Sequence, residues 1–213
     1  MSKSLVIAID GPAAAGKGTI AKAVASALDL AYLDTGSLYR AVAHAVLLAG
    51  GDPSSDTDAA RAAQMLDVGA IDPVAIRTRE VGSAASLVSA KPAVRASLLE
   101  TQRRVAKSPP GGKRGVVMDG RDIGTVVCPD ADVKLFVTAS DDARAHRRWL
   151  ELKKADPALT QKDVLADLQE RDRRDSERAA SPLVQADDAT LLDTTDLSIE
   201  ASIQAALDIV GRR

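Results

Sequence analysis

The sequence has few of the residues that mark several common classes of protein. Among its 213 residues there is one cysteine, Cys128, and aromatic side chains make up only 2%. A single cysteine excludes an intramolecular disulfide framework and is typical of a reducing compartment, so we expect a cytoplasmic protein. So few aromatic rings provide no stacking platform for single-stranded nucleic acid.

An excess of one charge and long apolar runs are missing as well. The formal net charge is -2, which gives no electrostatic attraction for nucleic acid or an anionic membrane. No stretch approaches the roughly 20 apolar residues of a membrane span, and the apolar run near the N-terminus is too short for a signal peptide. We therefore expect a soluble protein with neither nucleic-acid nor membrane partners.

What the sequence does contain is an alternation of short strands and helices. Apolar residues reach 46%, enough for a core built from Ala, Val, Leu and Ile. Helical spacing predicts helices over 17–28 and 37–48, another capped by Ser140, and a last one after Ser198. This alternation predicts a doubly wound, parallel α/β sheet. The predicted strands are 5–10, 31–34, 115–119, 133–138 and 190–193.

Two helical regions interrupt the alternation. Residues 54–107 show no convincing strand, and residues 141–180 are highly charged, with a possible capping pair at Thr160 and Asp163. We interpret them as insertions into a single domain, 1–213. The predicted core then comprises 1–53, 108–140 and 181–213.

A glycine-rich segment lies between the first predicted strand and helix. Its glycines allow a tight turn whose N–H groups cradle phosphates, at a helix N-terminus that adds positive charge. The lysine can reach the β- and γ-phosphates of a nucleoside triphosphate, and a hydroxyl can hold Mg²⁺. Here Gly18 follows the lysine directly and Thr19 comes next, an order common in small-molecule kinases of the adenylate-kinase type. The loop by itself indicates only a nucleoside triphosphate. The predicted phosphate loop is Gly11, Pro12, Ala13, Ala14, Ala15, Gly16, Lys17, Gly18 and Thr19.

Arginines gather in the second inserted region. Arg171, Asp175 and Arg178 have the spacing of one helix face, and Arg144, Arg147 and Arg148 form an earlier set. A solvated, salt-bridged helix would show the same pattern. However, a kinase needs cations around the transferred phosphoryl group, and arginine matches phosphate oxygens well.

Together these segments resemble bacterial-type cytidylate kinases, in the order of that family and over the whole chain. The DGRDIGTVV segment is the most specific. The resemblance implies transfer of the γ-phosphoryl group of ATP to CMP or dCMP, with Mg²⁺, by a P-loop nucleoside monophosphate kinase. It further implies a monophosphate-binding lobe at about 54–107 and a helical lid at about 141–180. The matching segments are 9–12, 33–40 (LDTGSLYR), 76–81 (IRTREV), 119–127 (DGRDIGTVV), 129–131, 170–178 (ERDRRDSER) and 181–183.

The resemblance also implies roles for individual residues. The acceptor phosphate would be held by Arg40 and Arg121, with Thr35 nearby and Arg178 reaching in from the lid. The cytosine edge would be read by Ser86, Arg95 and Asp122, and the sugar would be contacted by Arg171 and Asp175. Asp119 and Thr19 would serve Mg²⁺, and Arg147 and Arg148 would assist with ATP phosphates. The catalytic set is Lys17, Arg121 and Arg178.

Plain structural roles compete with several of these assignments. Ser86 could be a small residue at a helix contact, Arg95 a surface charge, and Asp122 a partner for an arginine. In addition, the family's extra strands in the monophosphate lobe fall where this chain is short, at residues 69–76, so the small sheet is expected to be trimmed or absent.

Three alternative functions remain open at this stage. The nearest is a P-loop kinase for another small acceptor, such as UMP or AMP. A GTP-binding switch is disfavoured because the chain has no Asn-Lys-x-Asp guanine signature, and a non-catalytic sensor because no matched arginine is missing. We expect no essential general base, since CMP is mostly a dianion at neutral pH, and we expect a monomer.

Overall fold

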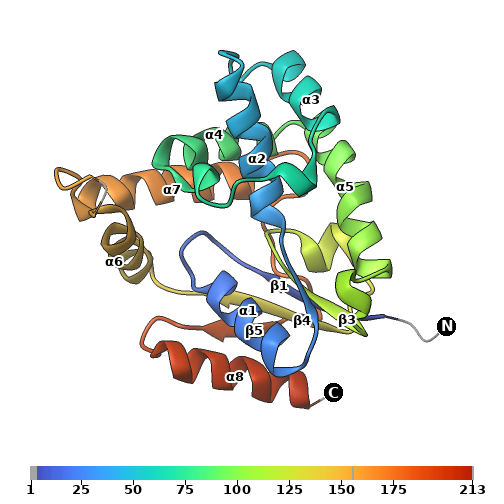
Figure 1. The fold of residues 1–213 in the computed structure, drawn as a ribbon. Coiled ribbons are helices and arrows are strands. Elements are labelled where there is room, and N and C mark those ends of the chain that lie inside the picture. Colours follow the sequence, from blue (N-terminus) through green and yellow to red (C-terminus); the bar gives the residue numbers. More distant parts are fainter. Residues whose placement is uncertain (1–3, 155, 213) are drawn as a thin grey trace.

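The computed structural model describes residues 4–154 and 156–212, which form a parallel sheet surrounded by helices (Figure 1). The strand order is β2-β3-β1-β4-β5, and every pair of neighbours is parallel. This confirms the predicted α/β fold class. All five strands have the predicted bounds: β1 (Leu5–Asp10), β2 (Ala31–Asp34), β3 (Gly115–Asp119), β4 (Val133–Thr138) and β5 (Thr190–Asp193).

Helices cover both faces of this sheet. Alternate residues of β1 point to opposite faces, as the two-residue period of a strand requires. Ile7 and Ile9 pack with α1 and α8, whereas Val6 and Ala8 pack on the side of α5. The central strands are therefore buried on both faces, which is why they are continuous apolar runs. The helices are α1 (Lys17–Ala27), α2 (Thr35–Leu48), α3 (Asp56–Gln64), α4 (Arg79–Ser89), α5 (Pro92–Lys107), α6 (Asp141–Leu152), α7 (Gln161–Glu177) and α8 (Ile199–Gly211).

Several helices begin at the side-chain caps that the sequence indicates. Ser140 and Ser198 accept backbone N–H bonds at the starts of α6 and α8, and Thr160 forms a capping box with Asp163. Helix α2 begins at Thr35, two residues before the prediction. The reason is Asp34, whose carboxylate caps α2 by accepting from the Ser37 N–H at 3.0 Å.

Residues 54–107 are helical, as predicted, and share one apolar core with α2. The apolar faces of α2, α3, α4 and α5 pack together at one end of the sheet (Figure 1). Between α3 and α4 the described chain forms only two short 3-10 turns, η1 (Val68–Ala70) and η2 (Ala75–Arg77). The small sheet expected to be trimmed or absent thus has no strand in this described stretch.

Helices α6 and α7 pack against each other, and α7 runs from α6 toward α4 (Figure 1). Helix α7 ends at Glu177, so Arg178 follows it in extended backbone rather than continuing the predicted helical face. Two further turns are η3 (Pro110–Gly112) and a π-helical turn, η4 (Ile123–Val127). Within the described residues, no helix is long and apolar enough to cross a membrane.

Candidate active site

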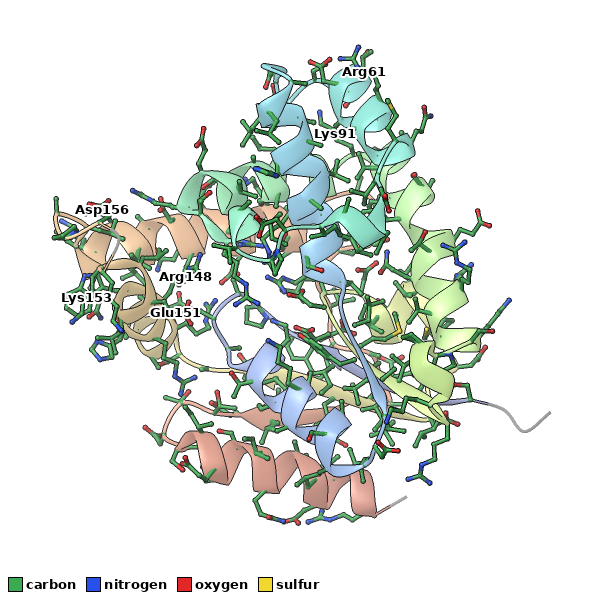
Figure 2. All side chains as sticks on the ribbon, viewed as in Figure 1. Arg61, Lys91, Arg148, Glu151, Lys153 and Asp156 are labelled. Atoms are coloured by element: carbon green, nitrogen blue, oxygen red, sulfur yellow. The ribbon has the colours of Figure 1, made fainter. Side chains whose placement is uncertain are left out.

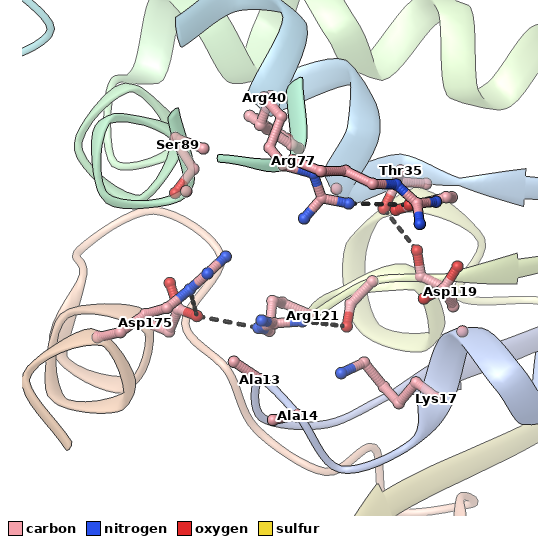
Figure 3. A pocket seen from close by; sticks show the side chains of 18 of the residues that line it. Ala13, Ala14, Lys17, Thr35, Arg40, Arg77, Ser89, Asp119, Arg121 and Asp175 are labelled. Atoms are coloured by element: carbon pink, nitrogen blue, oxygen red, sulfur yellow. Dashed lines mark hydrogen bonds and ion pairs between the residues drawn. The ribbon is translucent and has the colours of Figure 1, made fainter. Parts of the chain in front are cut away.

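A cavity of about 550 Å³ opens above the carboxyl ends of the strands, between the phosphate-loop segment and helices α2, α4, α5, α6 and α7. Nine Lys and Arg side chains line it, against five Asp and Glu side chains. Such a site has an excess of positive charge and suits polyanionic ligands. Figure 3 shows its centre, with Lys17 on one side and Arg40 and Arg77 on the other.

The predicted phosphate loop joins β1 to α1 and has the backbone that its composition indicates. Gly11 has a φ of 141°, and a Cβ there would lie 1.9 Å from the Val137 carbonyl oxygen, so only glycine fits. Gly16 also has a positive φ, 90°, at the N-cap of α1. Ala14 adopts a φ of 59°, a conformation uncommon for a residue with a side chain. The loop is thus bent tightly over the start of α1.

Three carbonyl groups of this loop are held by side chains. Pro12 accepts from Lys17 Nζ at 2.6 Å, Ala13 from Arg144 Nη1 at 3.2 Å, and Ala15 from Thr194 Oγ1 at 3.1 Å. Arg144 and Thr194 were not identified as supports of the loop from the sequence. No local signal could have found Thr194, because it lies 179 residues from Ala15 and meets it only through the sheet.

Lys17 is buried at the floor of the cavity. Burial lowers the pKa of its amine well below the usual value, and the charge of Arg121 lowers it further, whereas Asp119 and Asp10 act in the opposite direction. The positive charges of Arg121 and Arg171 both act on Lys17, and such a group of cations is unfavourable without an anion between them. The arrangement therefore favours a bound anion beside Lys17.

Asp119 lies where β3 ends, next to the start of α1. Its Oδ1 accepts from the Tyr32 hydroxyl at 2.8 Å, and its backbone oxygen accepts from Thr35 Oγ1 at 2.8 Å. Burial, followed by the nearby charge of Asp34, raises the pKa of Asp119 to about 6, while Lys17 opposes this rise. A Cβ on Gly18 would lie 3.8 Å from Oδ2, so this oxygen is close to the segment carrying Thr19, whose side chain is exposed at the cavity.

Two arginines expected to grip the acceptor phosphate are each oriented by a carboxylate. Arg40 Nη2 lies 2.8 Å from Asp34 Oδ2, and Arg121 Nε lies 2.9 Å from Asp175 Oδ2. Both arginines line the cavity, with Arg121 between Asp175 and Lys17 in Figure 3. These ion pairs set the direction of each guanidinium group before any ligand arrives.

Asp175 is the centre of a buried arginine cluster. Burial alone would raise the pKa of this carboxyl, but the charges of Arg121, Arg171 and Arg178 together hold it below its usual value. Arg171 Nε lies 4.0 Å from Asp175 and Arg178 Nη2 lies 3.8 Å from Asp122, too far for hydrogen bonds. Among the described residues, these two nitrogens and Arg40 Nε have no hydrogen-bond partner although they are buried. They are donors available to a ligand.

Arg95 and Asp122 form a buried ion pair at the far end of the cavity. Arg95 Nη2 donates to Asp122 Oδ2, and its Nη1 donates to the Ser89 carbonyl at 3.1 Å. Arg95 is 8% exposed, so it is not a surface charge. Asp122 is thus paired with an arginine, as one of the two interpretations of this residue predicted. Arg95 and Asp122 also line the cavity.

Ser86 is placed less directly than the sequence suggests. Gly82, Ala85 and Ser89 of α4 line the cavity. Ser86, four residues after Gly82 and three before Ser89, lies on the same side of the helix, but it is buried and does not line the cavity. Its hydroxyl is buried and has no hydrogen-bond partner among the described residues. Such an unpaired donor next to the cavity still suits a role in ligand recognition.

The two arginines expected to help with ATP phosphates separate in the structure. Arg147 donates to Thr194 Oγ1 at 3.0 Å and to the Thr194 carbonyl at 2.6 Å, and it does not line the cavity. Arg148 does line it, together with Glu151, its ion-pair partner at 2.8 Å. In Figure 2 Arg148 and Glu151 lie on the inner side of α6, whereas Lys153 and Asp156 lie farther out, beyond the end of this helix.

Arg77 and Tyr39 are among the lining residues that sequence reasoning missed. Arg77 reaches in from η2 near Arg40 and Thr35 (Figure 3). The Tyr39 ring packs against the guanidinium of Arg95, with 5.5 Å between the ring centroid and Cζ. Both lie inside segments that carry the family resemblance, at positions 77 and 39, so a closer reading of those segments could have found them.

Comparisons with known proteins find matches over nearly the whole chain. Residues 7–212 match the family model described as "Cytidylate kinase". The chain is 56% identical to the cytidylate kinase of Azorhizobium caulinodans and 52% identical to that of Rhodospirillum rubrum; each alignment covers 98% of both chains. A crystal structure of an uncharacterized protein from Eubacterium ventriosum has a TM-score of 0.58 at 12% identity, covering 98% of this chain and 99% of that one, and it shares the fold alone.

Proposed function

Because this chain belongs to the cytidylate kinase family, we propose that its cavity is where the γ-phosphoryl group of ATP is transferred to CMP or dCMP, giving ADP and CDP or dCDP. The observation that carries the proposal is the convergence of carboxylate-paired arginines opposite the phosphate-loop lysine, in one cavity. None of the comparisons favours UMP or AMP as the acceptor, or a GTP-binding switch.

ATP would bind through the phosphate loop. With the carbonyls of Pro12, Ala13 and Ala15 held by side chains, the loop's N–H groups are left to meet the phosphate chain. Lys17 Nζ, now bonded to the Pro12 carbonyl, would turn to the β- and γ-phosphates. Arg148 is the lid arginine in position to reach the same phosphates.

The residues near Lys17 also fit Mg²⁺, which prefers oxygen ligands and keeps several waters. The exposed hydroxyl of Thr19 and the Oδ2 atom of Asp119 supply such oxygens beside the loop. When bound, Mg²⁺ would neutralise charge on the β- and γ-phosphate oxygens. Tyr32 would hold the carboxylate of Asp119 in its orientation through the bond to Oδ1.

The acceptor phosphate would sit between Arg40, Arg121 and Arg77, with Thr35 holding the nearby backbone at Asp119. The guanidinium groups are already oriented by Asp34 and Asp175, so little reorganisation is needed when charge builds up in the transition state. Because CMP carries its own nucleophilic phosphate oxygen, these residues need to align and neutralise rather than remove a proton.

The rest of the nucleotide would occupy the far end of the cavity. Arg95 and Asp122, now paired with each other, would offer a donor and an acceptor to the base, and Ser86 would add its unpaired hydroxyl. Arg171 and Asp175 would contact the sugar, and Arg178 would reach both the phosphate and the base from the end of α7. Closure of the helical lid, about 141–180, over the lobe at about 54–107 would exclude water from ATP.

ADP formation from ATP and Mg²⁺ tests the reaction directly, with CMP, dCMP, UMP, AMP, GMP and shikimate supplied in parallel. We expect strong turnover with CMP and dCMP and little with the others. Turnover with a different acceptor alone would keep the kinase and overturn the base-reading roles, and no turnover with any acceptor would contradict the proposal. Light scattering with and without ATP would test the expected monomeric state.

A further inference from the structure

Asp10 has no place in the reaction described above, yet it is one of the most buried carboxylates in the described chain. It is the last residue of β1 and is 5% exposed. Its Oδ1 accepts from the Ile123 N–H at 2.8 Å, and its Oδ2 accepts from the Gly124 N–H at 2.7 Å. Both oxygens are thus engaged by the first turn of η4, more than one hundred residues away in sequence.

These two bonds hold the chain after β3 next to the end of β1, beyond the point where the sheet hydrogen bonds stop. The ladder between β1 and β3 pairs Ile9 with Asp119, and its last bond runs from the Gly120 N–H to the Ile9 carbonyl at 3.0 Å. Beyond Gly120 the chain leaves the sheet, and the next two residues are Arg121 and Asp122. The Asp10 carboxylate fastens the chain again directly after them.

On its other side, Asp10 leads into the phosphate loop. The next residue is Gly11, where a Cβ would lie 1.9 Å from the Val137 carbonyl oxygen, so the loop starts in close contact with β4. The Asp10 side chain therefore connects the start of the phosphate loop to the segment that carries Arg121. A shift of this segment would move Arg121 and Asp122 relative to the phosphate loop.

The chemistry of the side chain fits this task. Burial raises the pKa of Asp10 to about 6, while the two N–H bonds and the charge of Lys17 oppose the rise, so the carboxylate is ionised at neutral pH. Only a carboxylate offers two acceptor oxygens here. Asparagine has the same shape, but its NH₂ group would face one of the two N–H donors, and that bond would be lost.

We propose that Asp10 is a positioning residue that holds Arg121 and Asp122 in register with the phosphate loop, and thereby aligns acceptor with donor. The inference rests on the proposed reaction, since it acts through Arg121. A displacement of about 1 Å in such a group can lower the rate about a hundredfold. It predicts a defect in phosphoryl transfer with little defect in ATP binding.

The test is Asp10→Asn, assayed for kcat, for KM of CMP and for the Kd of ATP. We expect kcat/KM for CMP to fall about a hundredfold, with the Kd of ATP changed less than about threefold. The matched control is Asp132→Asn, because Asp132 also accepts a backbone bond on β1, from the Val6 N–H at 2.8 Å, but at the end away from the cavity. It should leave all three constants near those of the wild type.

A double variant shows whether Asp10 acts through Arg121. In an enzyme that already carries Arg121→Ala, adding Asp10→Asn should lower kcat little further. Full multiplication of the two losses would overturn the proposal, and so would a folded Asp10→Asn enzyme with wild-type kcat/KM. If Asp10→Asn does not fold, Asp10→Ser keeps one oxygen acceptor without the charge; unfolding of both variants would assign Asp10 to the fold alone and overturn the positioning role.

Amide hydrogen exchange tests the role of Asp10 independently of the proposed kinase reaction. In Asp10→Asn, the Ile123 or the Gly124 amide should exchange faster, while the amides of β1 keep their protection. Unchanged protection at both amides would overturn the proposal even in an active kinase. Conversely, faster exchange in a protein that makes no ADP from CMP would reject the proposed function and leave the structural link intact.

Discussion

The donor side of the cavity comes from one continuous segment, residues 11–19, whereas the acceptor side takes its side chains from α2, η2, α5, α7 and the turn after β3. The donor side depends on backbone geometry: residues with positive φ bend the loop, and N–H groups are free at the start of a helix. The acceptor side depends on ion pairs between residues far apart in sequence, such as Arg121 with Asp175. A local motif can therefore specify the first, and only the tertiary fold assembles the second.

The largest expected effect is on the acceptor side. Arg121→Ala removes a cation at the transferred group and leaves Asp175 without its closest partner, so we expect kcat to fall about a thousandfold or more. Steady-state ADP formation measures the loss, and circular dichroism checks the fold. The control is Arg61→Ala, an exposed arginine far from the cavity (Figure 2), which should keep normal turnover. Near-normal turnover in Arg121→Ala would mean that the ion-paired arginines do not act in transfer.

The next effect concerns base selectivity. Arg95→Ala leaves the buried carboxylate of Asp122 without its partner, and we expect the preference for CMP over UMP in kcat/KM to fall about ten- to a hundredfold. Ser86→Ala should have a smaller effect in the same direction. An unchanged preference in both variants would assign these residues to packing. It would also move base recognition elsewhere in the cavity.

The donor side should respond to a single methyl group. In Gly11→Ala the new Cβ would collide with the Val137 carbonyl and the φ of 141° would be strained, so we expect a loss of about 1–3 kcal/mol in the free energy of unfolding. ATP binding should weaken in the same variant. Gly211→Ala is the control, since a Cβ there meets nothing within 4 Å. Urea denaturation measures the difference, and equal stability of both variants would contradict a rigid loop.

The smallest expected effect is a rise in the melting temperature when Asp119, which lies between the donor and acceptor sides, is replaced. The pKa of Asp119 is about 6 in the folded protein against a usual 3.8. The native state therefore binds more protons than the unfolded state between these values, and this group's contribution makes the protein less stable as pH rises through that window. Asp119→Asn should raise the melting temperature at neutral pH but not near pH 4, while lowering activity. An Asn variant less stable than the wild type at both pH values would contradict this.

The features that could be predicted from the sequence also differ between the donor side and the acceptor side. The central strands could be bounded from apolar runs because a strand buried on both faces needs uninterrupted apolar residues, as in 115–118. The loop at 11–19 could be assigned its chemistry because its ligands are consecutive in the chain. The roles of Arg40, Arg95 and Asp122 came from the family resemblance alone, and they stay predictions. Their partners, Asp34 for Arg40 and the Arg95–Asp122 pair, could not be read from spacing.

The amino-acid sequence by itself determined the alternation of strands and helices, the phosphate loop and the family, because each depends on neighbouring residues or on order along the chain. Only the tertiary structure decided that Arg147 turns to Thr194, that Ser86 is buried without lining the cavity, and that Asp10 holds the turn after Arg121. The reason is physical. Hydrogen bonds and ion pairs act over a few ångströms, and residues separated by a hundred positions reach that range only when the sheet and its helices have brought them together.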